Sequence, residues 1–135
     1  WNDHAITAEV LRSMHRNQKI NHFPGMSELS RKNRLARNLN LMRKELPEDS
    51  QAYAGNDFFP LTWCLPLNYN DLLGYRRDNP SKTLIVKPEA GCQGRGIYLT
   101  DNASELEGKQ GLIVQEYLDA PYLIDGLKFD FRDRK

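Results

Sequence analysis

Cysteine is scarce in this sequence, and long apolar runs are missing from it. The two cysteines, Cys64 and Cys92, form no Cys-x-x-Cys pair and are too few for a disulfide framework, which favours a reducing, cytosolic setting. No stretch approaches the roughly 20 apolar residues that a membrane helix needs, and no secretory signal is visible. Because the first residue, Trp1, is not a methionine, we expect a processed chain or an excerpt from a longer one.

Net charge is also small. It is +1 over 135 residues, so the whole-chain field predicts neither nucleic-acid nor membrane binding. With 39% hydrophobic residues, the chain suits one compact domain with a modest core. One stretch is strongly basic and is either a surface for an acidic partner or a solvated helix face. Residues 31–44 contain no acidic residue and six basic ones: Arg31, Lys32, Arg34, Arg37, Arg43 and Lys44.

Helical periodicity dominates the first third of the chain. Apolar residues recur at helical spacing over residues 5–16, and again from Ser27, a good N-cap residue type, to residue 46. Residues 48–57 are polar and predict a loop, and a short helix is expected over 70–77. The period then changes to that of strands, expected at 58–65, 83–86, 97–100, 112–118 and 127–131. This order predicts an α/β or α+β fold with a mostly antiparallel sheet.

The densest glycine cluster is Gly-Cys-Gln-Gly-Arg-Gly at residues 91–96. Glycines let backbone amides approach an anion closely, so such a loop can cradle phosphate, although a plain turn is the commoner explanation. The spacing fits neither a dinucleotide-binding loop nor a P-loop. Because the loop joins two expected strands, the sequence predicts a hairpin tip folded over a ligand.

Lys87 ends the strand before this loop. Alone it suits a solvated strand end; beside a phosphate loop it supplies a cation of the right sign. A protein kinase has the glycine loop first and the lysine later, so the order here argues against a kinase. The three histidines are not at metal-ligand spacing with the cysteines, and we expect no metal ligands in this chain.

Two later segments carry further candidates. Residues 114–118 are either an ordinary strand or one whose backbone reads an adenine edge, walled by Tyr117 and Leu118. Lys128, Asp130 and Arg132 alternate along residues 127–132, in and just after the expected strand 127–131, and share one face. That face is either the wet side of a sheet or part of a nucleotide site.

Taken together, these segments resemble the tubulin–tyrosine ligase-like family. The matching motifs, in order, are Lys19-Ile20-Asn21-His22-Phe23-Pro24-Gly25-Met26, Arg31-Lys32, Leu35-Ala36-Arg37-Asn38, Thr62-Trp63, Val86-Lys87-Pro88, Gly94-Arg95-Gly96-Ile97, Gln115-x-Tyr117-Leu118 and Asp125-Gly126-x-Lys128-Phe129-Asp130-x-Arg132. The loop Gly-Cys-Gln-Gly-Arg-Gly is similar to the polyglutamylase branch. The resemblance implies an ATP-grasp fold, with residues 1–57 as an N-terminal helical segment and 58–135 as a truncated central lobe.

The resemblance also implies which residues hold the nucleotide and the substrate. Lys87 would contact ATP phosphates, with Lys32 near them. The other implied contacts fall into three groups: a lid of Gln93, Gly94, Arg95 and Gly96; an adenine site of Gln115, Glu116, Tyr117 and Leu118; and nucleotide contacts from Lys128, Phe129 and Asp130, with Arg132 beside them. Gln93 and Arg37 would face the protein substrate, and glutamine at position 93 resembles members that lengthen a glutamate chain.

The implied reaction is ATP-dependent glutamylation of tubulin. ATP would convert a glutamate side-chain carboxylate of a tubulin tail into an acyl phosphate, and the amine of free glutamate would attack it, with catalysis by positioning and charge neutralisation. The implied cofactors are ATP and Mg²⁺, with the metal ligands in a missing C-terminal part. We expect a cytoplasmic, cytoskeletal monomer, at a cilium or basal body, with microtubules as partner and no nucleic acid or membrane.

Family members continue well beyond the position of Arg132, so we expect a truncated form that does not ligate by itself. Two other functions stay open. One is a non-catalytic module that binds acidic tubulin tails through residues 31–44. The other is an ATP-grasp ligase with a different acceptor, since one fold hosts many substrates.

Overall fold

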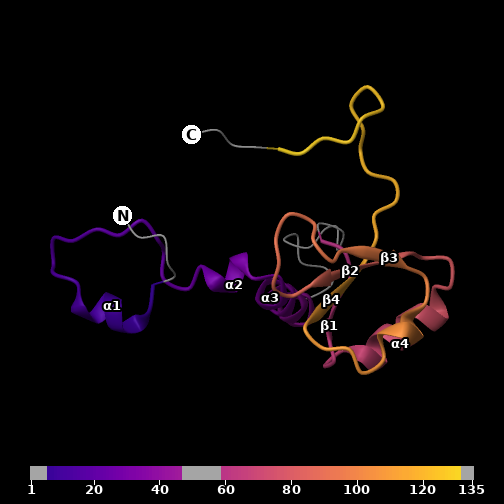
Figure 1. The fold of residues 1–135 in the computed structure, drawn as a ribbon, viewed down its shortest axis with the longest axis horizontal. Coiled ribbons are helices and arrows are strands. Elements are labelled where there is room, and N and C mark those ends of the chain that lie inside the picture. The colour runs from indigo at the N-terminus through magenta and orange to yellow at the C-terminus, as the bar shows by residue number, and fades with distance from the viewer. Residues whose placement is uncertain (1–5, 47–58, 132–135) are drawn as a thin grey trace.

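The computed structural model describes residues 6–46 and 59–131 (Figure 1). The helices are α1 (Ala8–Ser13), α2 (Ser27–Ser30), α3 (Lys32–Glu45), α4 (Tyr69–Asp78) and the 3₁₀-helix η2 (Ala103–Leu106). The strands are β1 (Thr62–Leu65), β2 (Leu84–Pro88), β3 (Tyr98–Thr100) and β4 (Leu112–Glu116). The predicted α+β class is confirmed: α1, α2 and α3 precede the strands, while α4 and η2 lie between strands in the sequence.

The four strands form one sheet in the order β1-β4-β2-β3, with every neighbouring pair antiparallel. The antiparallel sheet predicted from the sequence is therefore confirmed. Gln115 on β4 lies opposite Thr62 of β1 on one side and Ile85 of β2 on the other. Directly opposite residues share a face, so this register aligns side chains from three strands on each side of the sheet.

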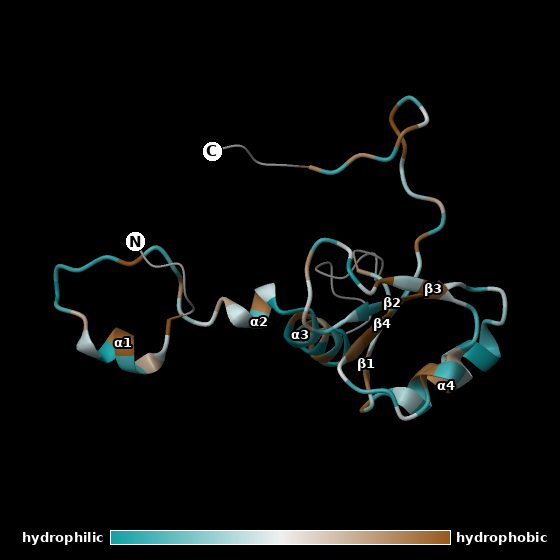
Figure 2. Ribbon diagram, in the orientation of Figure 1, coloured by the Kyte–Doolittle hydropathy of each residue, from teal (hydrophilic) through white to brown (hydrophobic). Residues whose placement is uncertain are grey.

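One face of the sheet carries the apolar core. Leu84 and Val86 of β2 and Val114 of β4 are fully buried against α4 and η2, whose Leu72 and Leu106 are also buried. Each such side chain stabilises the fold by about 1.5–3 kcal/mol relative to an exposed one. Figure 2 shows the apolar colouring gathered on β1 and β4 at this centre.

Helix α3 packs against β1 from the other side of the sheet (Figure 1). Its Ala36 is buried, and Asn40 Nδ2 donates a hydrogen bond to the carbonyl oxygen of Thr62 at 2.8 Å. Arg43 Nη2 donates to the carbonyl oxygen of Phe59 at 3.0 Å, and its guanidinium lies 4.1 Å from the centre of the Phe59 ring. These contacts hold the second half of α3 against β1 and the residues just before it.

The single helix predicted from Ser27 to residue 46 is wrong in one respect. Arg31 has extended backbone angles, φ −90° and ψ 126°, and separates α2 from α3. Ser27 is the first residue of α2 rather than its N-cap, and its hydroxyl accepts a hydrogen bond from Arg34 Nη1 at 3.0 Å. The first helix is also shorter than predicted, since α1 spans only Ala8–Ser13.

The strand predicted at 127–131 is also wrong. Leu127 forms only an isolated bridge with Ile124, and residues 128–131 belong to no strand within the described residues. The segment leaves the sheet after β4 and runs away from it (Figure 1). Alternating side chains are not sufficient for a strand, because its backbone groups also need a neighbouring strand to accept and donate hydrogen bonds.

Other predictions fall partly outside the described residues. These are the start of the first helix at Ala5, the loop 48–57, the boundary between segments 1–57 and 58–135, and Arg132. Strand β1 begins at Thr62, later than the predicted Phe58, with Pro60 lacking the N–H that a strand interior needs. Across the part of the chain that is described, no helix is both long enough and apolar enough to span a bilayer.

Candidate functional site

Strands β2 and β3 form an antiparallel hairpin whose connection carries the glycine-rich motif. Val86 lies opposite Tyr98 in the register, and residues 89–97 join the two strands. The backbone takes positive φ at Gln93 (57°), Gly94 (74°) and Gly96 (70°). A Cβ added at Gly96 would lie 2.9 Å from Pro88 Cγ, so a larger residue is excluded there without a shift. The hairpin predicted by the sequence is present, while its function as a lid stays a prediction.

The first turn of α3 is tied to this connection. Lys32 Nζ donates a hydrogen bond to the carbonyl oxygen of Gly91 at 2.8 Å, and Asn33 Nδ2 donates to Glu89 Oε1. The backbone N–H of Glu89 in turn donates to the carbonyl oxygen of Gly111 at 2.8 Å. A hollow of about 100 Å³ lies at this junction, lined by Lys32, Pro88, Gly91, Cys92, Gln93, Gly94, Arg95 and Ile97. The predicted residues Lys32, Gln93, Gly94 and Arg95 therefore do come together.

Lys87 is held by a chain of hydrogen bonds that crosses three strands. Its ammonium donates to Gln115 Oε1 at 2.7 Å, and Gln115 Nε2 donates to Thr62 Oγ1 at 2.8 Å. The Thr62 hydroxyl then donates to the carbonyl oxygen of Pro60 at 2.8 Å. Lys87 is half-buried on this face, so its side chain has a defined position rather than the freedom of a solvated strand end.

The electrostatics of this corner favour an anion. Burial, and then the positive charge of Lys32, lower the pKa of Lys87. Desolvation disfavours the charged form of a lysine, and a nearby like charge does the same. A bound anion would relieve both effects by giving the two ammonium groups a common counter-charge. Lys32 and Lys87 are therefore the described residues best placed to hold a phosphate.

The predicted adenine segment divides between the two faces of the sheet. Gln115 lies on the Lys87 face, whereas the Glu116 carboxylate lies on the other and pairs with Lys82 Nζ at 2.8 Å. Hydrogen bonds from Lys82 and then Tyr75 lower the pKa of Glu116 against the opposing effect of burial. The backbone N–H of Tyr117 donates to the carbonyl oxygen of Thr83 at 2.9 Å. Side-chain contact with adenine is thus open to Tyr117 and the following residue, Leu118, which are exposed.

The residues predicted after β4 do not join the lysine cluster. Lys128 Nζ pairs with Asp130 Oδ1 at 2.9 Å, and both side chains are exposed. Phe129 packs edge-on against Phe131, with ring centres 5.3 Å apart. The segment that contains these residues extends away from the sheet after β4 (Figure 1), and it therefore lies apart from β2. Arg132 lies outside the described residues.

The basic helix presents part of its charge to solvent. Arg31, Arg37 and Lys44 are exposed, whereas Arg34 is paired with Glu28. Arg37 is exposed on α3, and its contact with a substrate stays a prediction. No cluster of three or more His, Cys, Asp or Glu side chains among the described residues could hold a metal ion.

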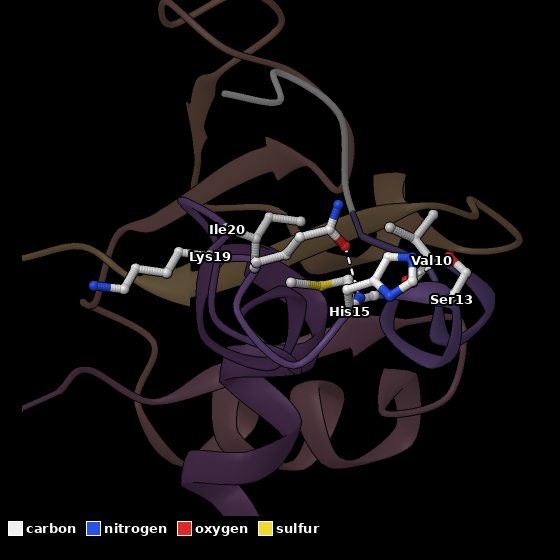
Figure 3. Close-up of a pocket in the computed structure, with 7 residues that line it drawn as sticks. Val10, Ser13, His15, Lys19 and Ile20 are labelled. Carbon is white, nitrogen blue, oxygen red and sulfur yellow. Dashed lines mark hydrogen bonds between the residues drawn. The ribbon is translucent and has the colours of Figure 1, made fainter.

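A larger hollow, of about 380 Å³, lies in the N-terminal segment (Figure 3). It is lined by Val10, Ser13, Met14, His15, Gln18, Lys19 and Ile20. Gln18 Oε1 accepts a hydrogen bond from the backbone N–H of His15 at 2.7 Å, which links two of the residues that line the hollow. Only Lys19 and Ile20 belong to a motif that the sequence singled out, and this hollow contains none of the predicted nucleotide contacts.

The profile of the tubulin-tyrosine ligase family matches residues 10–133. The chain belongs to the tubulin-tyrosine ligase family. A probable beta-tubulin polyglutamylase of Tetrahymena thermophila is 53% identical over 134 residues, which cover 98% of this chain and 11% of that protein. The human tubulin polyglutamylase TTLL13 is 48% identical over 132 residues, covering 98% of this chain and 16% of that protein. The tubulin polyglutamylase TTLL7 of Xenopus tropicalis is 41% identical over 136 residues, covering 98% and 14%.

The chain therefore spans 11–16% of the length of these relatives. The resemblance to the polyglutamylase branch, which the glycine loop carried in the sequence, is confirmed. In this member of the tubulin-tyrosine ligase family, the sequence did not single out two side chains of the site, Asn33 and Glu89, which hydrogen-bond to each other. Thr62 belongs to one of the matching motifs, but the sequence assigned it no contact with Gln115, which depends on the order of the strands.

Proposed function

We propose that this chain supplies the phosphate-binding part of the ATP site of a tubulin polyglutamylase. The observation that carries the proposal is the convergence of Lys32 and Lys87 beside the glycine hairpin of a chain in this family. Two ammonium groups close together in a partly buried corner are suited to phosphate oxygens, and a glycine-rich loop can add backbone N–H donors. Lys87 and Lys32 would hold the phosphates, and Gly94 and Arg95 would close over them as a lid.

The remaining contacts follow from where the side chains lie. Tyr117 and Leu118 are exposed beyond the end of β4 and would flank adenine, with Gln115 beside them. Lys128, Phe129 and Asp130 would reach the nucleotide only if their segment folds back toward the sheet. We place no magnesium ligand among the described residues, and bound Mg²⁺ would supply further charge neutralisation on the phosphates.

The reaction in the complete enzyme would be isopeptide ligation. A glutamate side-chain carboxylate of tubulin would attack the γ-phosphorus of ATP, giving an acyl phosphate and releasing ADP. The amine of free glutamate would then attack the acyl carbon, and phosphate would leave as the C–N bond forms and the amine loses a proton. Gln93, at the tip of the hairpin, and Arg37, exposed on α3, would both face the acceptor. The proposed outcome is elongation of a glutamate chain on microtubules in the cytoskeleton.

Calorimetric titration of the chain with Mg-ATP tests the site. Lys87→Ala should weaken binding at least about tenfold, because a hydrogen bond to a charged group is worth roughly 1.5–3 kcal/mol. Lys109→Ala is the matched control, since Lys109 Nζ also contacts one side-chain oxygen, that of Tyr98, at 3.4 Å. Equal affinities for the wild type and Lys87→Ala, or no binding by a folded wild type, would contradict the proposal.

Ligation is tested in a chimera. The corresponding residues of the Tetrahymena thermophila relative are replaced by this chain, which is 53% identical to them. Labelled glutamate should enter tubulin in an ATP-dependent reaction, and the same chimera with Lys87→Ala should incorporate much less. An active chimera that tolerates Lys87→Ala would refute the assignment of that lysine.

A second function is favoured by the exposed cations of α3. Arg31, Arg37 and Lys44 face solvent, and residues 31–44 carry no acidic side chain that could offset them. This surface would bind acidic tubulin tails without nucleotide. Fluorescence anisotropy of a labelled glutamate-rich peptide should show binding that weakens as salt is added. Arg37→Ala should weaken this binding, whereas the control Arg77→Ala, at another exposed site, should leave it unchanged. Binding that is insensitive to salt would argue against it.

A further inference from the structure

Thr62 is a buried polar residue at the end of the hydrogen-bond chain that holds Lys87. It is 6% exposed, and its Oγ1 lies 2.8 Å from the carbonyl oxygen of Pro60 and 2.8 Å from Gln115 Nε2. A carbonyl oxygen can only accept, so the single hydroxyl hydrogen of Thr62 is donated to Pro60. The hydroxyl oxygen is then left to accept from the amide nitrogen of Gln115.

This arrangement fixes which end of the Gln115 amide faces Lys87. With Nε2 turned to Thr62, Oε1 is turned to the ammonium, 2.7 Å away. An ammonium has three donors and no acceptor, so only the oxygen end of the amide can hold it. Without the hydroxyl of Thr62, the amide loses the partner that distinguishes its two orientations.

We propose that Thr62 is a positioning residue for the nucleotide site, because its hydroxyl orients the Gln115 amide and thereby sets the place of the Lys87 ammonium. This inference rests on the proposed function, in which Lys87 contacts phosphate. A neutral amide at position 115 also holds the ammonium without cancelling its charge, whereas a carboxylate there would compete with the incoming phosphate.

The other titratable side chains on this side of the sheet do not replace Gln115. Lys32, from α3, carries the same charge as Lys87 and repels it. Glu89, in the connection, accepts a hydrogen bond from Asn33. Cys64, on β1, has its pKa raised by burial and then by Glu89, so it is neutral at ordinary pH. The hydrogen bond from Gln115 to Thr62 is therefore the contact whose removal changes the position of Lys87 without removing a charge from this side of the sheet.

The test measures Lys87 directly. Trace acetylation of the folded chain with acetic anhydride, followed by peptide mass spectrometry, gives the reactivity of each lysine across pH. Thr62→Val should raise the reactivity of Lys87 at neutral pH roughly tenfold, because losing a hydrogen bond to the ammonium favours the neutral amine. Thr62→Ser, which keeps the hydroxyl, should restore the wild-type value. Thr100→Val is the matched control, since Thr100 lies on the strand at the opposite edge of the sheet and, among the described residues, its hydroxyl bonds to the backbone of Asn102.

The same variants are titrated with Mg-ATP, and Thr62→Val should weaken binding about tenfold while Thr62→Ser stays close to the wild type. Unchanged reactivity of Lys87 in Thr62→Val, or equal behaviour of the serine and valine variants, overturns the inference. If Thr62→Val does not fold, Gln115→Leu must give the same rise in Lys87 reactivity, and its absence overturns the inference equally. If the labelling follows expectation but neither the wild type nor any variant binds Mg-ATP, the effect of Thr62 on Lys87 is supported and the proposed function is refuted.

Discussion

Gly96 and Gly94 form a matched pair for testing how tightly the hairpin is built. Both have positive φ, +70° and +74°, but a Cβ at Gly96 would meet Pro88 Cγ at 2.9 Å, while one at Gly94 meets nothing within 4 Å. Alanine at either position has a backbone penalty of about 1–2 kcal/mol. At Gly96, the contact with the stiff proline ring adds about 1–3 kcal/mol, the usual cost of overpacking. We therefore expect Gly96→Ala to destabilise the chain by that additional amount relative to Gly94→Ala.

Equilibrium unfolding in urea, followed by tryptophan fluorescence and far-UV circular dichroism, measures this difference. A shift of the midpoint at constant m-value reports stability alone. Mg-ATP titration of the same proteins should show a larger loss of affinity for Gly96→Ala than for Gly94→Ala. The new methyl group would displace Pro88, which is adjacent to Lys87 at the end of β2. Equal free energies of unfolding for the two variants would refute the reasoning from the Pro88 contact.

Three further expectations concern pH and the core. Because burial and Lys32 lower the pKa of Lys87, Mg-ATP affinity should fall as pH rises through that lowered pKa, before an ordinary lysine titrates near 10.5. Lys32→Ala should weaken binding and move this fall to higher pH in calorimetry. Glu116 has a pKa lowered from 4.5, chiefly by Lys82, so its contribution to stability is present above pH 4.5 and is lost as pH falls through the lowered value. Glu116→Gln should remove that part of the acid sensitivity in urea titrations, at a cost of about 1 kcal/mol at neutral pH, since Lys82 is half exposed. Leu72→Ala, at a fully buried site, should cost about 2–5 kcal/mol in the same assay, and a smaller loss would mean that α4 is loosely packed.

The sequence predicts the fold best where local pattern decides it. The β-branched runs around Val86 and Val114 form strands, and the glycine spacing correctly indicates a hairpin rather than a strand–helix turn. The sequence does not indicate the interruption at Arg31, because no proline or glycine marks it. The alternation at 127–131 wrongly predicts a strand, because alternation shows which residues share a face but not whether a neighbouring strand exists.

In the candidate site, too, the sequence indicates the residues that form local motifs but not the contacts between distant segments. Lys87 and the loop residues were identified from their order along the chain, which a sequence displays directly. Thr62 acquires its place only because β4 separates β1 from β2, a pairing across 53 residues. Lys32 reaches Gly91 across 59 residues. Contacts of this kind depend on tertiary packing, and no local propensity predicts them.

The position of β4 has a consequence for how the chain reaches this structure. Among the described strands β4 is the last in sequence, yet it occupies the interior of the sheet, between β1 and β2. During synthesis β1 must wait, without its hydrogen-bonding neighbour, until Leu112–Glu116 has emerged from the ribosome. Until then only the β2–β3 hairpin can close, and pairings of such long sequence separation form slowly because loop-closure entropy must first be overcome. The proposed nucleotide site, which depends on Gln115, would therefore form after the β2–β3 hairpin.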